Sequence, residues 1–106
     1  MSINEWSDAT AMTEAVQNKT VSPLELVEAT IRETERTNSR INAIVSQRYE
    51  KALKEAEARD FSEKPFAGVP IFLKDLGQEQ AGEPSTAGSR LFTSYRATET
   101  DNYVKK

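Results

Sequence analysis

The segment from residue 68 to residue 76 is the feature that most constrains the fold of this chain. It begins Gly-Val-Pro, continues as a short apolar run and ends abruptly in Lys74-Asp75. A short apolar run that follows a glycine is typical of a buried strand. Pro70 has no N–H to donate to a ladder, which favours the start of a strand or a sheet edge. The pattern predicts a strand over residues 69–73 that delivers Lys74 to the edge of a core.

The chain before this segment has a helical pattern. Ser7-Asp8 can cap a short helix that runs to about Asn18. Ser22-Pro23-Leu24-Glu25 is a second helix start, with a serine cap, a proline at the first helical position and a glutamate that can complete a capping box. This helix is expected to fade at residues 37–39, where three short polar side chains compete for the backbone. Its apolar stripe consists of Leu24, Val27, Ile31 and Thr34.

The remaining elements are shorter. Residues 41–45 are apolar and β-branched, which predicts a brief strand or an extended link, and a third helix follows from about Gln47 to Arg59. Residues 77–89 hold three glycines and a proline and are expected to form a long ordered loop. A cap with an acidic first turn at residues 98–101 then begins a helix just before the last residue. Because a native domain rarely ends one turn into a helix, we expect a truncated domain.

Composition excludes several classes of function. The 106 residues suffice for one small domain, and cysteine and histidine are both absent. Disulfides, thiol nucleophiles, Cys/His zinc sites and every triad with histidine are therefore excluded. The net charge of −3 and the interleaved basic residues argue against direct nucleic-acid binding. No apolar stretch reaches the roughly 20 residues that a bilayer requires, and no signal peptide is recognisable, so a cytoplasmic location is expected.

Lys74 is the main candidate for chemistry. A lysine accepts a proton near neutral pH only when burial disfavours its ammonium form, and the apolar run before it could provide that setting. The alternative is a solvated lysine paired with Asp75. For Asp75 itself a structural hydrogen-bonding role is favoured, because an ion pair would oppose base function. Ser85 and Ser89 are expected to be ordinary residues of a turn-rich loop, and neither they nor Ser94 are expected to be nucleophiles.

Several segments together resemble the amidase signature family of serine hydrolases. In that family a Gly-Val-Pro run leads into a strand that ends in Lys-Asp, as residues 68–75 do here. Residues 22–27 and 40–44 resemble the helical arm of the family and the link after it, and residues 85–89 resemble the segment before the glycine-serine core. The resemblance covers nearly the whole chain, in the family's order.

The resemblance implies a Ser-Ser-Lys mechanism for cleaving carboxamide C–N bonds, with Lys74 as the base that accepts a proton from a bridging serine. It implies no metal and no organic cofactor. The Gly-Gly-Ser-Ser-Gly-Gly stretch of the family and the nucleophilic serine are absent, so we expect the chain alone to be inactive. The expected fold class is mixed α/β, with a helical arm of about three helices over residues 1–60. Residues 61–106 would begin the catalytic core, with one or two strands.

Two alternatives remain open. The glutaminase component of the tRNA-dependent amidotransferase shares the arm and the lysine strand, and would act together with a partner protein. A helical interaction module without enzymatic activity is the other alternative. The expected partners are a small amide substrate for the parent protein and, through the unpaired edge of residues 69–73, a second copy of the fragment. Neither a nucleic acid nor a membrane is expected.

Overall fold

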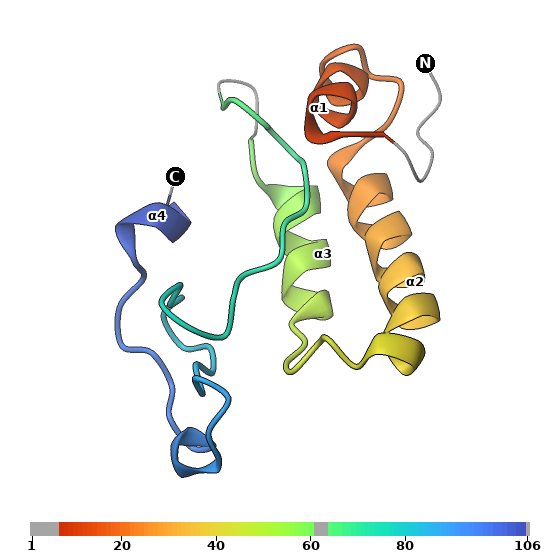
Figure 1. Ribbon diagram of the computed structural model, residues 1–106. Helices are drawn as coiled ribbons and strands as arrows, with labels where there is room; N and C mark the ends of the chain where they lie inside the picture. Colours follow the sequence, from red (N-terminus) through yellow and green to blue (C-terminus); the bar gives the residue numbers. More distant parts are fainter. Residues whose placement is uncertain (1–6, 61–63, 106) are drawn as a thin grey trace. The chain divides into compact units, whose positions relative to one another are not determined.

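The computed structural model describes residues 7–60 and 64–105 (Figure 1). The chain divides into two compact units, Met1–Pro70 and Ile71–Lys106, which are described separately. The first unit contains α1 (Ala9–Gln17), α2 (Pro23–Ile41) and α3 (Tyr49–Ala58). The second contains a 3-10 turn, η1 (Arg90–Phe92), and a single helical turn, α4 (Asn102–Lys105).

The predicted helix starts are confirmed. Asp8 caps α1, with its Oδ1 accepting a hydrogen bond from the amide of Ala11 at 2.8 Å. Ser22 caps α2, with its Oγ accepting from the amide of Glu25 at 3.1 Å. Each cap satisfies one of the amides that the first turn of a helix leaves without an intrahelical partner. Pro23 occupies the first helical position, as the sequence predicts.

The predicted end of α2 is wrong, because the helix continues through residues 37–39 to Ile41. Asn38 does not compete with the helical backbone. Its Oδ1 accepts from the amides of Ala43 and Ile44, at 2.8 and 2.9 Å, and so fixes the chain just after the helix. Asn42 ends the helix in the left-handed conformation, with φ 49°. Of the two predictions for the link before α3, the extended link is confirmed and the strand is not.

The helices α2 and α3 lie side by side and form most of the core of the first unit (Figure 1). Val27 and Thr34 of the predicted stripe are buried, but Leu26, which lies outside that stripe, is buried further, with 2% of its surface exposed. The buried residues of this unit, among those described, are Ala15, Leu26, Val27, Thr34, Ala56, Ala67 and Gly68. Most of them have small side chains, so the core is modest.

Gly68 fits against the start of α2. Its φ is +79°, and a Cβ at this position would lie 2.8 Å from Cγ and 3.1 Å from Cβ of Pro23. A glycine is therefore favoured here for two reasons: its backbone conformation is strained for other residues, and a side chain would clash with the ring of Pro23. This contact joins two of the segments that the sequence singled out, the Ser-Pro-Leu-Glu helix start and the Gly-Val-Pro run.

The predicted strand over residues 69–73 does not form among the described residues. Ile71 and Phe72 are 71% and 58% exposed, and no other described segment pairs with this run. A strand is stabilised by the ladder it makes with a neighbour, and this extended segment has none. The helical part of the predicted fold class is thus present, whereas the mixed α/β class is not confirmed.

Antiparallel pairing occurs elsewhere in the second unit. The amide of Gly82 donates to the carbonyl of Ala97 at 2.8 Å, and the amide of Ala97 donates to the carbonyl of Glu83 at 3.0 Å. A single bridge between Pro84 and Arg96 extends this contact. Residues 77–89 therefore form a loop, as predicted, and the loop is held by the segment that precedes α4. No helix in the described part of the chain has the length and apolar character needed to cross a membrane.

Candidate functional site

Lys74 follows the extended segment of the second unit, and its side chain is exposed. Its backbone N–H donates to Oε1 of Gln78 at 2.7 Å, which fixes the chain at the lysine. The apolar residues Ile71 and Phe72 are exposed as well, so they do not enclose the ammonium group. The buried setting that a basic lysine requires is therefore not built by the described residues of this unit.

Asp75 has the structural role that the sequence favoured. Its Oδ1 accepts a hydrogen bond from the amide of Thr86 at 2.8 Å, and its Oδ2 accepts from Oγ1 of Thr86. Its backbone carbonyl also accepts from the amide of Ala87 at 2.9 Å. We call the two side-chain bonds the Asp75–Thr86 clamp. The clamp joins the Lys-Asp sequence to residues 85–89, the other segment that resembles the amidase signature family.

The hydrogen bonds of the clamp hold the pKa of Asp75 below its ordinary value. The hydroxyl of Thr86 has the largest effect, followed by the amide of Thr86, and the positive charge of Lys74 contributes least among the causes. The carboxylate is thus stabilised mainly by the loop rather than by the neighbouring lysine. Among the described residues no carboxylate forms an ion pair with Lys74.

This lowered pKa predicts a pH dependence of the clamp. Because the pKa of Asp75 is lower in the folded chain than in the unfolded one, the clamp stabilises the fold at pH values above the unfolded pKa of about 3.9. That stabilisation is lost as the pH falls through the folded pKa. We expect the amide proton of Thr86, followed by NMR, to shift in a titration with a midpoint below about 3.9. Asp75→Asn should abolish this titration, and a midpoint above that value would contradict the prediction.

A second polar cluster in the same unit was missed by sequence reasoning. The amide of Glu79 donates to Oδ2 of Asp101 at 2.8 Å, and the amide of Asp101 returns a bond to the carbonyl of Glu79 at 2.9 Å. The hydroxyl of Thr100 accepts from the amide of Ala81 at 3.0 Å. The pattern of residues 98–101 indicates only a cap for the last helix, and α4 does begin directly after them. Nothing in that local pattern indicates a partner 22 residues away in sequence.

The serines show no sign of nucleophilic activation. Ser89 caps η1, with its Oγ accepting from the amide of Leu91 at 3.2 Å, which is the turn role that the sequence predicts. A nucleophilic serine needs a base within hydrogen-bond reach, and no such bond to Ser85, Ser89 or Ser94 is present among the described residues. Among the residues that the structure describes, no three acidic side chains lie close enough together to hold a metal ion.

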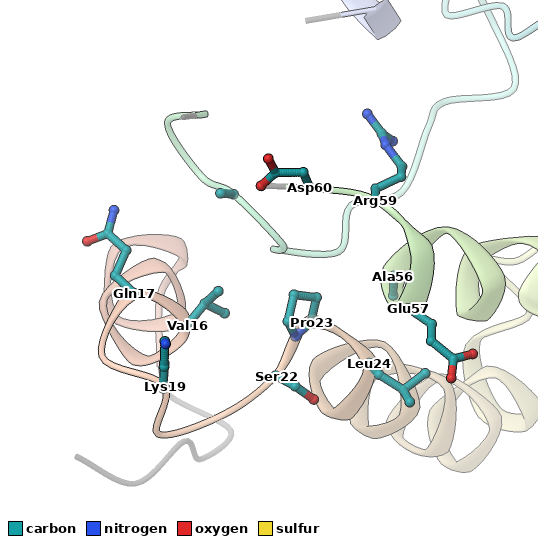
Figure 2. A pocket seen from close by; sticks show the side chains of 11 residues that line it. Val16, Gln17, Lys19, Ser22, Pro23, Leu24, Ala56, Glu57, Arg59 and Asp60 are labelled. Carbon is teal, nitrogen blue, oxygen red and sulfur yellow. The ribbon is translucent and has the colours of Figure 1, made fainter. Parts of the chain in front are cut away.

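The first unit has a groove of about 600 Å³ of its own (Figure 2). Pro23 and Val16 line its apolar part, while Lys19, Arg59 and Asp60 add charged groups. Ser22 also lies there, but its Oγ is occupied as the cap of α2. No paired nucleophile and base face this groove among the residues that line it, and Lys74 is not one of them. The candidate site therefore remains Lys74 and the Asp75–Thr86 clamp.

Comparison with known proteins gives a consistent result. The Amidase family model matches residues 25–106, which include most of α2, Lys74 and the clamp. The 6-aminohexanoate-cyclic-dimer hydrolase of Paenarthrobacter ureafaciens is 37% identical over 106 residues, covering 98% of this chain and 21% of the enzyme. The lipoamidase of Enterococcus faecalis is 39% identical over 103 residues, covering 95% of this chain and 14% of the enzyme.

A third relative is named as part of an amidotransferase rather than as an amide hydrolase. It is a glutamyl-tRNA(Gln) amidotransferase component from Oleidesulfovibrio alaskensis, 35% identical over 85 residues, covering 76% of this chain and 17% of that protein. The chain thus spans about a fifth or less of the length of these relatives. No solved structure matches the chain. The family match over residues 25–106 and the identity along nearly the whole chain lead to one conclusion: the chain belongs to the amidase family.

Proposed function

We propose that this chain is the part of an amide hydrolase that provides the general base, Lys74, of a Ser-Ser-Lys triad. The observation that best supports the proposal is the engagement of Asp75 by Thr86, inside the region matched by the Amidase model. An adjacent carboxylate would favour the ammonium form of the lysine. The clamp engages both carboxylate oxygens of Asp75 with Thr86, and no described carboxylate forms an ion pair with Lys74, so its Nζ is available to contact a serine.

In the proposed reaction Lys74 accepts a proton from a bridging serine, which in turn activates the nucleophilic serine. The nucleophile attacks the amide carbonyl, the amine or ammonia leaves, and water releases the acid. The serine-rich stretch that would provide these groups does not occur in the 106 residues. Lys74 is also exposed within its unit. The proposal therefore requires further residues that contribute the two serines and shield Lys74 from solvent.

The same requirement applies to the predicted strand. We propose that residues 69–73 join a mixed sheet in the whole protein, with residues 1–60 as its helical arm and residues 61–106 as the start of the catalytic core. The exposure of Ile71 and Phe72 supports this, since both would be covered by a sheet and its neighbours. The relatives are about five times longer or more and offer enough chain to form such a sheet.

A second candidate is the glutaminase component of an amidotransferase. The 35% identity to the glutamyl-tRNA(Gln) amidotransferase component supports it, and Lys74 would then act on glutamine as the amide substrate. The two candidates share the base and differ in their dependence on a partner. An amide hydrolase acts alone on linear carboxamides, whereas the glutaminase component would release ammonia from glutamine only together with its partner.

The proposal is tested by assaying the protein that carries this segment. We expect ammonia or amine release from a panel of linear carboxamides, and none from the isolated 106-residue chain. Ammonia release from glutamine that appears only when the partner proteins are added would favour the second candidate. If the protein hydrolyses no carboxamide and no glutamine under either condition, the enzymatic proposal is wrong and an interaction module remains.

We also propose that the isolated chain associates with itself. The exposed apolar side chains of residues 71–72 and the unpaired backbone beside them form the kind of edge that pairs with another copy. In sedimentation experiments we expect oligomers whose fraction rises with concentration, and we expect Ile71→Lys to shift the chain toward monomer. Leu91→Lys is the matched control, because Leu91 is 83% exposed but lies outside that run. A monomer at all concentrations would contradict this proposal.

A further inference from the structure

We infer that Asp75 is a positioning residue for Lys74, which it serves through the Asp75–Thr86 clamp. This inference rests on the proposed function, in which Lys74 is the base. Asp75 would not touch the substrate or the reacting atoms. Its role would be to fix the backbone from which the lysine side chain extends.

The hydrogen bonds around Lys74 hold its backbone from both sides. On one side its own N–H donates to Gln78 at 2.7 Å. On the other side the next residue, Asp75, is bound through its carboxylate to Thr86 and through its carbonyl to Ala87. The peptide between Lys74 and Asp75 thus lies between two anchors, of which one is local and the other comes from a loop 11 residues further along the chain.

This anchoring matters because a general base must lie about 2.6–3.2 Å from the proton donor. Lysine has a flexible four-carbon stem, so freedom in its backbone adds to the freedom of its Nζ. Misplacement by about 1 Å can lower a rate about 100-fold. In the described residues the lysine side chain itself is exposed, so its backbone anchors are the positioning contacts that this unit provides.

Asp101 offers a matched control within the same unit. Its carboxylate also accepts a backbone amide, that of Glu79, at 2.8 Å, the same distance as the bond from the Thr86 amide to Asp75. Both bonds are partly buried. Asp101 makes none of the contacts that hold the Lys74–Asp75 peptide. If the role of Asp75 is purely structural, loss of either carboxylate should lower kcat by a similar factor. If Asp75 positions Lys74, loss of the Asp75 carboxylate should lower kcat much more than loss of the Asp101 carboxylate.

The experiment uses the protein that carries this segment and compares Asp75→Ala with Asp101→Ala. We expect Asp75→Ala to lower kcat about 100-fold while KM changes little, because the loss is in the transition state. Asp75→Asn, which keeps one acceptor oxygen, should fall between Asp75→Ala and the unaltered protein. Asp101→Ala should leave kcat nearly unchanged in folded protein. Equal losses of kcat in the two alanine variants would overturn the inference.

Two further variants keep the test decisive if Asp75→Ala does not fold. Thr86→Val removes the hydroxyl donor of the clamp and keeps the backbone amide, so it should lower kcat, whereas Thr86→Ser should restore it. Unchanged kcat in Thr86→Val would also overturn the inference. Lys74→Ala distinguishes the proposed base from the proposed positioning residue. If it leaves kcat intact, the proposed function fails, whereas a loss in Lys74→Ala without any loss in Asp75→Ala removes only the positioning role.

Discussion

Replacing Lys74 by alanine is expected to lower kcat about 10²- to 10⁴-fold in the protein that carries this segment, the usual contribution of a general base. The reason is that no second group near Lys74 in the described part of the chain could accept the proton. The chain has no histidine, and the carboxylate of Asp75 is already engaged by Thr86. Steady-state kinetics on a linear carboxamide measures the effect directly, and KM should change much less than kcat.

Two matched variants identify the cause of that loss. Lys74→Arg keeps the positive charge but introduces a guanidinium group that stays protonated, so it cannot act as a base. We expect this variant to be as impaired as the alanine variant. Lys54→Ala removes an exposed lysine from α3 and should leave kcat unchanged. If Lys74→Arg retains most of the activity, the lysine acts through its charge and the proposed role as a base is wrong.

Replacing Gly68 by alanine is expected to lower the free energy of unfolding by about 2–4 kcal/mol, from backbone strain and overpacking together. At φ +79° an alanine would adopt a strained conformation, and its Cβ would lie 2.8 Å from Cγ of Pro23. Since Pro23 begins α2, the ring cannot move away without disturbing the helix start. Urea denaturation followed by far-ultraviolet circular dichroism measures the change.

Gly82→Ala separates the two contributions. Gly82 has φ +82°, close to that of Gly68, but nothing lies within 4 Å of a Cβ built there. This variant should therefore show only the backbone strain, about 1–2 kcal/mol. If both variants lose the same free energy of unfolding, the contact with Pro23 contributes nothing to the loss in Gly68→Ala.

The sequence predicted those elements whose signals are local. Asp8 and Ser22 predicted the starts of α1 and α2 correctly, because a capping side chain binds an amide only two or three residues away. The end of α2 was less predictable. Asn38 belongs to a residue type that often ends helices, but here its side chain binds the amides that follow the helix. Which of the two roles an asparagine takes depends on the path of the chain beyond it.

Contacts between distant residues could not be predicted in the same way. The sequence suggested a structural role for Asp75, but its partner, Thr86, is 11 residues away and no spacing rule identified it. The strand over residues 69–73 has the composition of a strand, yet a strand also needs a neighbour to pair with. The described residues provide none, and the antiparallel pairing formed instead between the segments around Gly82 and Ala97.

The proposed role of Lys74 as the base of a serine hydrolase can be checked by a crystal structure of the protein that carries this segment. We predict that Nζ of Lys74 lies about 2.6–3.2 Å from a serine Oγ, shielded from solvent, with the carboxylate of Asp75 still bound to Thr86. A Lys74 that faces solvent, or that forms an ion pair with Asp75 and has no serine oxygen within reach, would contradict this role.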